Sequence, residues 1–271
     1  MNPFSAYSYL FVPGTRPDRY TKALESGAGA VIIDLEDAVS AADKPKAREA
    51  VAQHLADLPP VLIRINGIET EWFHDDLMMC KHHKVAGIML PKAEQAGDIE
   101  FIATQLGAEI SIYPLIETAK GMSSAGDIAR SRNVKQLAFG SIDFQLDMGI
   151  ADDDQGLLYF RSHLVLASRL ANIAAPIDGV TVAVNDQNAL RVDAQRSRGL
   201  GFGGKLCIHP NQIGLVNSAF GPSEQEIAWA KRIVDSAATA QGAAVLVEGQ
   251  LVDKPVLLRA QAILNRPSKG A

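Results

Sequence analysis

The segment ISIYPLIET, residues 110 to 118, is an apolar run that ends in an ionisable side chain, Glu117. Its isoleucine, tyrosine and leucine residues are typical of a strand buried on both faces, as in a parallel sheet covered by helices. A carboxylate at the end of such a strand must be paired, hydrated or bound to a metal ion. The fold and the other polar residues indicate which of these applies.

Short apolar runs of this kind recur along the chain, between longer stretches that carry charge and helical spacing. They lie at residues 8–14, 30–37, 61–66, 85–92, 110–118, 134–143, 175–181 and 204–210. This alternation indicates βα units around a parallel sheet. Eight such units within about 220 residues predict an α/β fold of the TIM (β/α)8 barrel type rather than an open sheet.

A C-terminal extension follows the predicted barrel, which we assign to residues 1–221. In the extension, residues 222–271, a helix is predicted to begin with a capping box formed by Ser223 and Glu226. An extended pair turning at Glu248 and Gly249 comes next, and a last helix begins near Pro255. We expect this helical and extended segment to pack on the barrel or on a neighbouring subunit.

The composition excludes several classes of protein. The 271 residues are 47% hydrophobic and 21% charged, with a formal net charge of −5, which is typical of a soluble globular protein without a basic surface for nucleic acid. Cys80 and Cys207 belong to no CxxC pattern, which argues against a disulfide framework or a zinc site. No apolar run reaches about 18 residues and no leader pattern is found, so we expect a cytoplasmic protein without a membrane span.

Polar residues close most of the predicted strands. The active site of a TIM barrel lies at the C-terminal ends of its strands, so these residues mark a candidate site. They are Asp34, Glu36, Asp37, Arg64, Asn66, Lys92, Glu117, Ser141, Asp143, Asp178 and His209. Taken singly, each has an ordinary explanation, such as a helix N-cap at Asp37 or a structural ion pair at Arg64. Taken together, they favour a site.

Glu117 and Asp143 are the most informative pair. They follow neighbouring strands, so their carboxylates are expected to converge, and two close anions need a cation or a shared proton. Oxygen ligands without cysteine or a His-x-His pattern favour Mg²⁺ over zinc. A salt bridge from Glu117 to Arg64 or Lys92 is the alternative, but it leaves Asp143 unexplained.

The surrounding residues suggest what the metal ion is for. Glu36 and Asp37 are expected to hold its water ligands from a second shell. Mg²⁺ can bind a 2-oxo or 2-hydroxy acid through its carboxylate and neighbouring oxygen, and Arg64 would complement the negative charge of a carboxylate or enolate. In the GSID sequence, Gly140 allows the backbone N–H groups near Ser141 and Ile142 to approach the same substrate.

Eight motifs together resemble the citrate lyase beta-subunit-like family of the HpcH/HpaI aldolase superfamily. In order they read LFVPGTRPDRYTKAL, VIIDLEDAVSAADKPKAREAV, IRIN, LPKAE, PLIETAKG, FGSIDFQLDMG, GFGGKLCIHPNQI and VDKPV. The resemblance runs from about Ser8 to about Leu264. It implies a TIM barrel that assembles as trimers or hexamers and uses Mg²⁺ to cleave or form a carbon–carbon bond in a 3-hydroxy-3-carboxyacyl thioester.

The resemblance also assigns roles to residues of this chain. It places the metal ligands at Glu117 and Asp143 and a substrate contact at Arg64. It implies that Asp253, in the motif GQLVDKP, is a catalytic acid or base supplied by a neighbouring subunit. Relatives hold coenzyme A at the start of the chain, which corresponds here to Phe11, Arg19 and Lys22.

Within this family, residues 178–190, DGVTVAVNDQNAL, resemble stand-alone members rather than subunits of the large citrate lyase complex. The expected function is therefore a carbon–carbon lyase that cleaves citramalyl-CoA to acetyl-CoA and pyruvate by a retro-Claisen step, with malyl-CoA or citryl-CoA as the next candidates. Two alternatives stay open. One is a CoA-independent aldolase acting on hydroxy-oxo acids, and the other is a non-catalytic or partner-dependent citrate lyase beta subunit.

Overall fold

Eight parallel strands close into a barrel in the computed structural model, which describes residues 6–239, 245–247 and 250–265. The strands are β1 (Ser8–Pro13), β2 (Ala30–Asp34), β3 (Val61–Arg64), β4 (Val85–Leu90), β5 (Ser111–Ile116), β6 (Gln136–Phe139), β7 (Ala174–Asp178) and β8 (Gly204–Cys207). Each strand pairs with the next along the chain, and β8 pairs with β1 to complete the ring. The predicted TIM barrel is confirmed.

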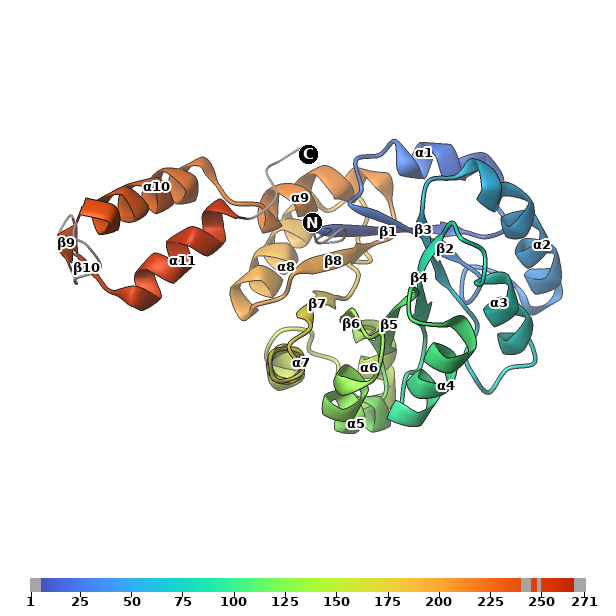
Figure 1. The fold of residues 1–271 in the computed structure, drawn as a ribbon. Coiled ribbons are helices and arrows are strands. Elements are labelled where there is room, and N and C mark those ends of the chain that lie inside the picture. The colour runs from blue at the N-terminus through green and yellow to red at the C-terminus, as the bar shows by residue number, and fades with distance from the viewer. Residues whose placement is uncertain (1–5, 240–244, 248–249, 266–271) are drawn as a thin grey trace. The chain divides into compact units, whose positions relative to one another are not determined.

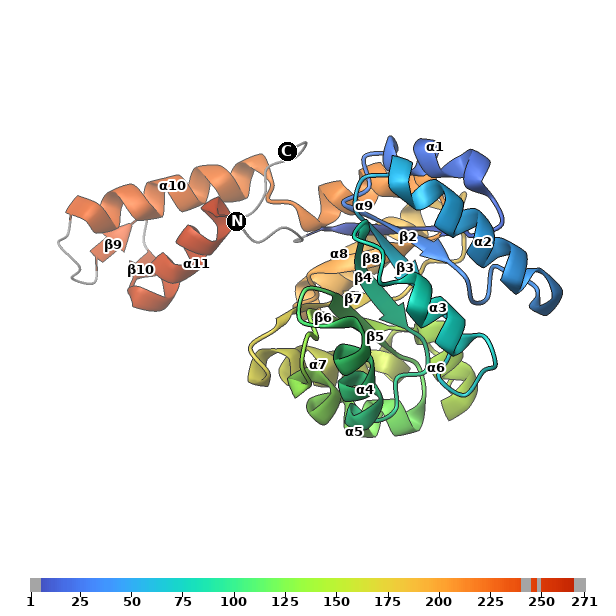
Figure 2. The same cartoon turned by 45° about the vertical axis from the view of Figure 1, so that its right-hand side comes forward.

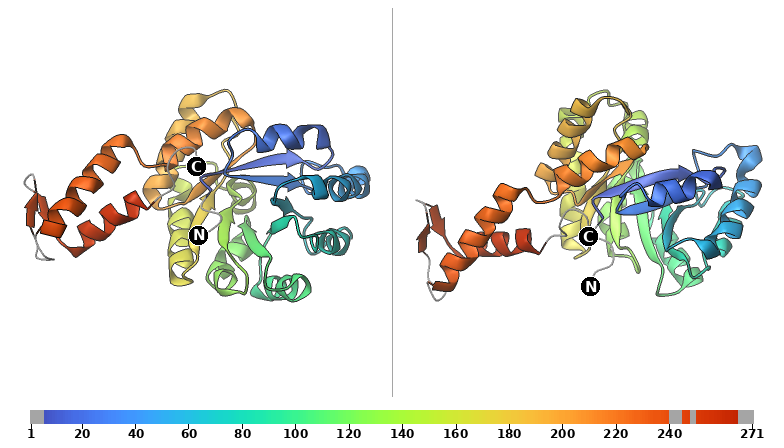
Figure 3. Two further views of the ribbon diagram at one scale, coloured as in Figure 1. Left: turned by 45° about the horizontal axis from the view of Figure 1, so that its top comes forward. Right: turned by 90° about the horizontal axis from the view of Figure 1, so that it is seen from above.

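Helices cover the outside of this ring (Figure 1). They are α1 (Tyr20–Leu24), α2 (Lys44–His54), α3 (Phe73–Met79), α4 (Ala96–Leu106), α5 (Ala119–Arg130), α6 (Ser141–Met148), α7 (Gln155–Leu170), α8 (Gln187–Leu200) and α9 (Ile213–Phe220). Ala47 and Val51 of α2, and Leu55 directly after it, are all buried. Figure 3 gives two further views, in which β1 and β2 lie side by side.

The direction of each side chain follows from its position along the strand. Ile32, Leu62 and Leu115 belong to one apolar cluster inside the barrel. Successive side chains of a strand point to opposite faces, so the residue two positions further on points to the same side. Asp34, Arg64 and Glu117 stand two positions after these three residues. At the C-terminal ends of these strands, the apolar barrel interior is therefore followed by charged side chains.

The segment after β6 differs from the sequence prediction. The run at residues 134–143 was expected to be one strand with its polar end, but β6 ends at Phe139 and α6 begins at Ser141. Gly140 is the residue of the turn between them. Ser141, Ile142 and Asp143 thus form the first turn of a helix, where a carboxylate interacts favourably with the helix dipole.

The chain divides into two compact units, Met1–Val216 and Asn217–Ala271, a few residues before the division expected at 221/222. The second unit contains α10 (Glu224–Thr239), the antiparallel pair β9 (Val245–Val247) and β10 (Gln250–Val252), and α11 (Lys254–Leu264). Helices α10 and α11 pack against each other, as Figure 2 shows. Packing of this extension on the barrel or on a neighbouring subunit stays a prediction.

The extension has its own small core. Ala230 and Ile233 of α10 are buried together with Val252, Ala260 and Ile263. The predicted capping box is present, since the N–H of Glu226 donates to Oγ of Ser223 at 3.1 Å and the Ser223 N–H donates to the Glu226 carboxylate at 2.8 Å. The turn predicted at Glu248 and Gly249 lies outside the described residues. Among the described helices, none is both long and apolar enough to cross a membrane.

Candidate active site

A cavity of about 390 Å³ opens at the C-terminal ends of the barrel strands. Its walls are largely apolar, with Phe11, Leu115, Phe139, Val180, Leu206 and Ile208 among them. Its polar lining comprises Asp34, Asp37, Arg64, Glu117, Ser141 and Asp143. The structure therefore brings Arg64, the two expected metal ligands and the GSID segment together around one hollow.

Glu117 is buried at the floor of this cavity, with a side chain that is only 4% exposed. The backbone N–H of Lys92 donates to its Oε1 at 2.7 Å, from a residue in the left-handed conformation with φ of 47°. Burial, reinforced by the charges of Asp143 and Glu36, raises the pKa of Glu117 to about 8, although the Lys92 N–H and Arg64 act in the opposite direction. The carboxylate is thus held in place, and no ion pair to it is found in the part of the chain that the structure describes.

Gly140 lies directly against Glu117. A Cβ atom at residue 140 would overlap the Oε2 and Cβ atoms of Glu117. The absence of a side chain at this turn therefore lets the α6 N-terminus approach the buried carboxylate. This close approach gives the predicted role of Gly140 a physical basis.

The donor set fits a hard divalent cation. Among the described residues, no cluster of three or more His, Cys, Asp or Glu side chains is arranged to bind a metal. Glu117 and Asp143 supply two carboxylates to the cavity, Asp143 from an exposed position on α6. Mg²⁺ commonly uses only one or two protein carboxylates and keeps several waters. An ion between them would also satisfy the buried charge of Glu117.

Arg64 is held by Asp34, its partner in the register of β2 and β3. Its Nε donates to Oδ1 of Asp34 at 2.7 Å and its Nη2 to Oδ2 at 2.6 Å. The guanidinium also lies 4.7 Å from the ring centre of Phe11. The alternative of a salt bridge from Glu117 to Arg64 is not found, because Arg64 pairs with Asp34. Among the described residues, Lys92 contacts Glu117 through its backbone N–H and not through an ion pair.

Glu36 and Asp37 lie beside the remaining nitrogen of the same guanidinium. Nη1 of Arg64 is 3.0 Å from Oε2 of Glu36 and 3.5 Å from Oδ2 of Asp37. The Glu36 oxygen is buried and makes no aligned hydrogen bond within the described part of the chain. Burial raises the pKa of Glu36 to about 7, despite the opposing charge of Arg64, and the neighbouring Asp37 and Asp34 add to the rise. The expected role of Glu36 and Asp37 in holding metal-bound water stays a prediction.

A second hollow of about 540 Å³ adjoins the cavity. Arg19 and Lys22 line it, and Phe11, Pro13 and Ile208 line both hollows. The three residues expected to contact coenzyme A therefore share one groove. The groove leads from two cationic side chains to the wall of the cavity.

Asp253, the expected catalytic residue of the extension, is described within the second unit. It is the N-cap of α11, and its Oδ1 accepts the N–H of Val256 at 3.1 Å. Its side chain is exposed. The sequence alone predicted a helix start at this point, while the catalytic role came only from the resemblance.

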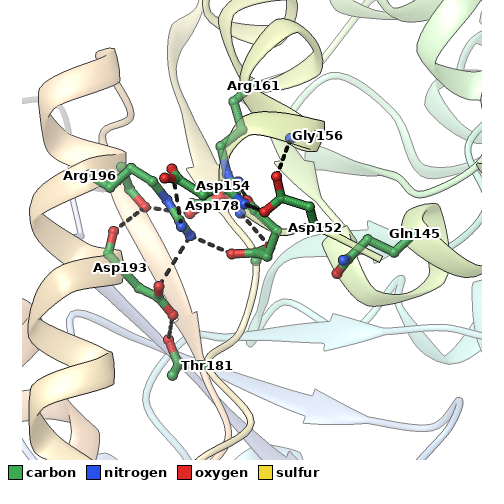
Figure 4. Close-up of polar contacts among 12 residues, drawn as sticks. Gln145, Asp152, Asp154, Gly156, Arg161, Asp178, Thr181, Asp193 and Arg196 are labelled. Carbon is green, nitrogen blue, oxygen red and sulfur yellow. Dashed lines mark hydrogen bonds and ion pairs between the residues drawn. The ribbon is translucent and has the colours of Figure 1, made fainter. Parts of the chain in front are cut away.

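Asp178 closes β7 but does not belong to the cavity. It follows Ile177, which faces the barrel interior, so Asp178 points outward to the helices. There it accepts a hydrogen bond from Nε of Arg161 at 3.1 Å and another from the Ser197 hydroxyl (Figure 4). Burial opposes its charge, yet Lys205 and Arg161 hold the pKa of Asp178 below its usual value. Its inclusion among the candidate site residues was wrong.

His209 also has a local structural role. Its Nδ1 accepts the N–H of Asn211 at 3.1 Å and caps the short helix at Pro210–Gln212. The backbone N–H of Lys92 and the carboxylate of Asp34 are functional groups for which sequence reasoning found no role. Strand periodicity places Asp34 on the same face as Ile32, but a run that is apolar on both faces does not show which face lines the barrel.

Comparison with known proteins identifies the family. The model of the HpcH/HpaI aldolase/citrate lyase family matches residues 7–210. A citrate lyase subunit beta-like protein of Deinococcus radiodurans is 37% identical over an alignment of 274 residues, which covers 95% of this chain and 96% of that protein. A (3S)-malyl-CoA thioesterase of Cereibacter sphaeroides is 33% identical, over 96% of this chain and 93% of that protein.

Solved structures agree with this result. The CitE protein of Mycobacterium tuberculosis in complex with magnesium, acetoacetate and coenzyme A has a TM-score of 0.84 and 32% identity, covering 97% of this chain and 98% of that one. The citrate lyase beta subunit from the same organism, complexed with oxaloacetate and magnesium, has a TM-score of 0.72 and 31% identity over 82% of this chain and all of that one. Magnesium in both agrees with the predicted cofactor, and the predicted enzyme class, a carbon–carbon lyase, is confirmed. The chain therefore belongs to the HpcH/HpaI aldolase/citrate lyase family.

Proposed function

We propose that the protein is a magnesium-dependent lyase that cleaves a 3-hydroxy-3-carboxyacyl-CoA thioester by a retro-Claisen reaction. Citramalyl-CoA is the proposed substrate, giving acetyl-CoA and pyruvate. Malyl-CoA is the next candidate because a relative in Cereibacter sphaeroides is named for that thioester. The observation that carries the proposal is the placement of Glu117, Asp143 and Arg64 around one cavity.

Glu117 and Asp143 would hold the metal ion, which supplies a Lewis acid for the carboxylate and hydroxyl oxygens of the substrate. Arg64 is fixed at the wall of the same cavity, where its guanidinium stabilises negative charge on the thioester enolate as the carbon–carbon bond breaks. The backbone at Gly140, Ser141 and Ile142 approaches the substrate carboxylate. The apolar walls exclude water, which strengthens these electrostatic interactions.

Proton transfer falls to Asp253 of a neighbouring subunit. In cleavage, the electron pair of the breaking bond moves to the thioester, the hydroxyl oxygen loses its proton, and the enolate carbon gains one. A single carboxylate can serve both proton transfers, as base and then as acid. This role requires an oligomer, trimeric or hexameric, in which the extension of one chain reaches the barrel of another.

Coenzyme A would lie in the groove lined by Arg19 and Lys22. Cationic side chains there complement its phosphate groups. Phe11 borders both this groove and the cavity, so a thioester in the groove would place its acyl group against Arg64. The CitE relative bound to coenzyme A supports a CoA thioester over a free hydroxy-oxo acid.

The first experiment is a turnover assay with citramalyl-CoA, malyl-CoA and citryl-CoA, each with Mg²⁺ and with EDTA. Formation of acetyl-CoA and oxo acid from at least one thioester, lost on adding EDTA, is the expected result. Cleavage that persists in EDTA would contradict the metal requirement. Turnover of free hydroxy-oxo acids alone would favour a CoA-independent aldolase. Binding of acetyl-CoA without any turnover would favour a partner-dependent subunit.

The shared site has a separate test. Glu117→Gln and Asp253→Asn should each abolish turnover, the first in the barrel and the second in the extension. When the two inactive chains are co-expressed, about a quarter of the sites should combine an intact Glu117 with an intact Asp253 from another chain. Recovery of activity supports sharing between subunits. An inactive mixture that still forms mixed oligomers contradicts it.

A further inference from the structure

Asp34 uses every acceptor position of its carboxylate, and it is 1% exposed. The fork of Arg64 takes one position on each oxygen, at 2.7 and 2.6 Å. Oδ1 also accepts the backbone N–H of Glu36 at 2.9 Å, and Oδ2 accepts that of Ala38 at 3.1 Å. One buried carboxylate therefore binds both the guanidinium and the loop that follows β2.

These contacts determine which part of Arg64 is left for other groups. Nε and Nη2 point at Asp34, while Nη1 lies on the other side, next to Glu36 and Asp37. The Phe11 ring covers the guanidinium. A bidentate pair fixes the plane of the guanidinium as well as its position, which a single hydrogen bond cannot do.

We propose that Asp34 is a positioning residue for the reaction: it acts through Arg64, setting the orientation in which that guanidinium meets the substrate. The inference rests on the proposed function, in which Arg64 stabilises the developing enolate. In this role Asp34 takes no part in proton transfer and contacts no reacting atom. Its effect on turnover is therefore expected to require the planar fork of Arg64.

A comparable pair in the same barrel provides a matched control. Asp178 closes β7 as Asp34 closes β2, is completely buried, and also binds an arginine, Arg161. This pair faces the helices rather than the cavity. If Asp34 served only to hold the barrel together, the two aspartates would behave alike in every assay.

The test is a double-mutant cycle on Asp34 and Arg64, with thermal unfolding measured for every variant. Asp34→Asn keeps the shape of the side chain but offers only one oxygen to the fork. We expect kcat to fall 10- to 100-fold, with a smaller change in KM, as is usual for residues that orient a group bound to substrate. Arg64→Lys keeps the charge and removes the fork, and should cause a loss of similar size or larger.

The double variant decides between the explanations. If Asp34 acts through Arg64, the double variant loses no more activity than Arg64→Lys alone. Losses that multiply would overturn the proposal, because Asp34 would then act independently, through the Glu36 loop or through stability. Asp178→Asn should lower the unfolding temperature while the folded protein retains the kcat of the parent. An equal fall of kcat in Asp178→Asn would also overturn it.

A second measurement separates failure of this inference from failure of the proposed function. Pyruvate binding in the presence of Mg²⁺ can be measured by calorimetry without any turnover. If the parent binds pyruvate but cleaves no thioester, the proposed lyase function fails, and the same cycle on the dissociation constant still tests the link from Asp34 to Arg64. A non-additive loss of affinity supports the positioning role. The positioning role is overturned by an additive loss of affinity or by unchanged affinity in Asp34→Asn. It is also overturned if the parent does not bind pyruvate.

Discussion

Two groups of charged side chains lie on the barrel, and they differ in how many of their acids have a basic partner. On the cavity side, the carboxylates of Asp34, Glu36 and Asp37 contact the guanidinium of Arg64, and those of Glu117 and Asp143 line the same cavity. On the β7 side, Asp153, Asp154, Asp178 and Asp193 interact with Arg161, Arg196 and Lys205. Figure 4 shows much of this second group, in which each acid has a basic partner. The first group carries excess negative charge within the described residues.

The pKa directions follow this difference. Burial raises the pKa of Glu117 to about 8, whereas the cations around Asp178 keep its pKa low in spite of complete burial. A group in which every acid has a basic partner needs no external cation. An unbalanced buried group requires protons or an external cation. Excess charge, rather than the presence of charge, therefore distinguishes the candidate site from a structural network.

The largest expected effect is opposite stability changes on the two sides. Asp178→Asn removes a charge that Arg161 and Lys205 need, and should lower the free energy of unfolding by about 3 to 5 kcal/mol. Glu117→Gln removes an uncompensated charge, and should raise the free energy of unfolding at pH 8 without metal. Urea unfolding in EDTA measures both. Equal destabilisation by the two variants would remove the distinction between the sides.

The pH dependence of stability should reveal the same excess charge. The pKa of Glu117 rises from 4.5 to about 8 on folding, so the folded state binds this proton more tightly than the unfolded chain. Its contribution is full below about pH 4.5 and is lost as the pH rises through about 8. Metal-free protein should lose on the order of 3 kcal/mol across this window. Unfolding in EDTA from pH 5 to 8 tests this, with Glu117→Gln as the control that flattens the curve.

Saturating Mg²⁺ should reduce that loss, because the ion binds the ionised carboxylate of the folded protein. Glu36, with a pKa raised to about 7, adds a loss of the same sign over a narrower range. A pH profile that is identical with and without Mg²⁺ would count against metal binding at Glu117.

A smaller effect is expected from the glycine that touches Glu117. Gly140→Ala places a Cβ against the carboxylate and should lower stability by about 1 to 3 kcal/mol and weaken Mg²⁺ binding. Gly97 lies within α4 and has open space around it. Gly97→Ala should raise stability by about 0.5 to 1 kcal/mol without changing metal affinity. Mg²⁺ titrations by calorimetry on both variants show whether the change at residue 140 is specific to the site.

The smallest expected effect concerns a carboxylate that belongs to neither group. Asp253 is exposed and caps α11, so Asp253→Ala should lower the stability of the extension by about 1 kcal/mol. Asp253→Asn keeps an oxygen for the Val256 N–H and should change stability by only a few tenths of that. Local unfolding of α11, followed by hydrogen exchange, measures the difference. Loss of turnover in the Asn variant with an intact α11 would then reflect chemistry rather than capping.

The sequence was sufficient to predict the barrel because parallel strands covered on both faces are continuous apolar runs. It was also sufficient to place Glu117 and Arg64 in the cavity, since both end such runs. Asp143 was placed near the right position but on a strand, because apolar composition cannot distinguish the end of β6 from the first turn of α6. Gly140 was the local signal for that turn.

The remaining details depend on register and on backbone groups. Asp34 and Asp178 both end apolar runs, but they stand at opposite parity relative to the inward-facing Ile32 and Ile177, and only the structure fixes that parity. The Lys92 N–H that holds Glu117 depends on a left-handed backbone conformation, which lysine adopts rarely. The pattern of side chains in the sequence does not predict a backbone donor of this kind.

The bidentate hold on Arg64 also has an entropic consequence. A free arginine side chain loses about 2 kcal/mol of rotamer entropy when it is ordered, and an exposed one would lose it on meeting a ligand. Here the rotamer is already selected by Asp34 when the chain folds. Binding an anion at this guanidinium should therefore carry little conformational entropy cost from the arginine, and Asp34→Asn should shift that cost from folding to binding.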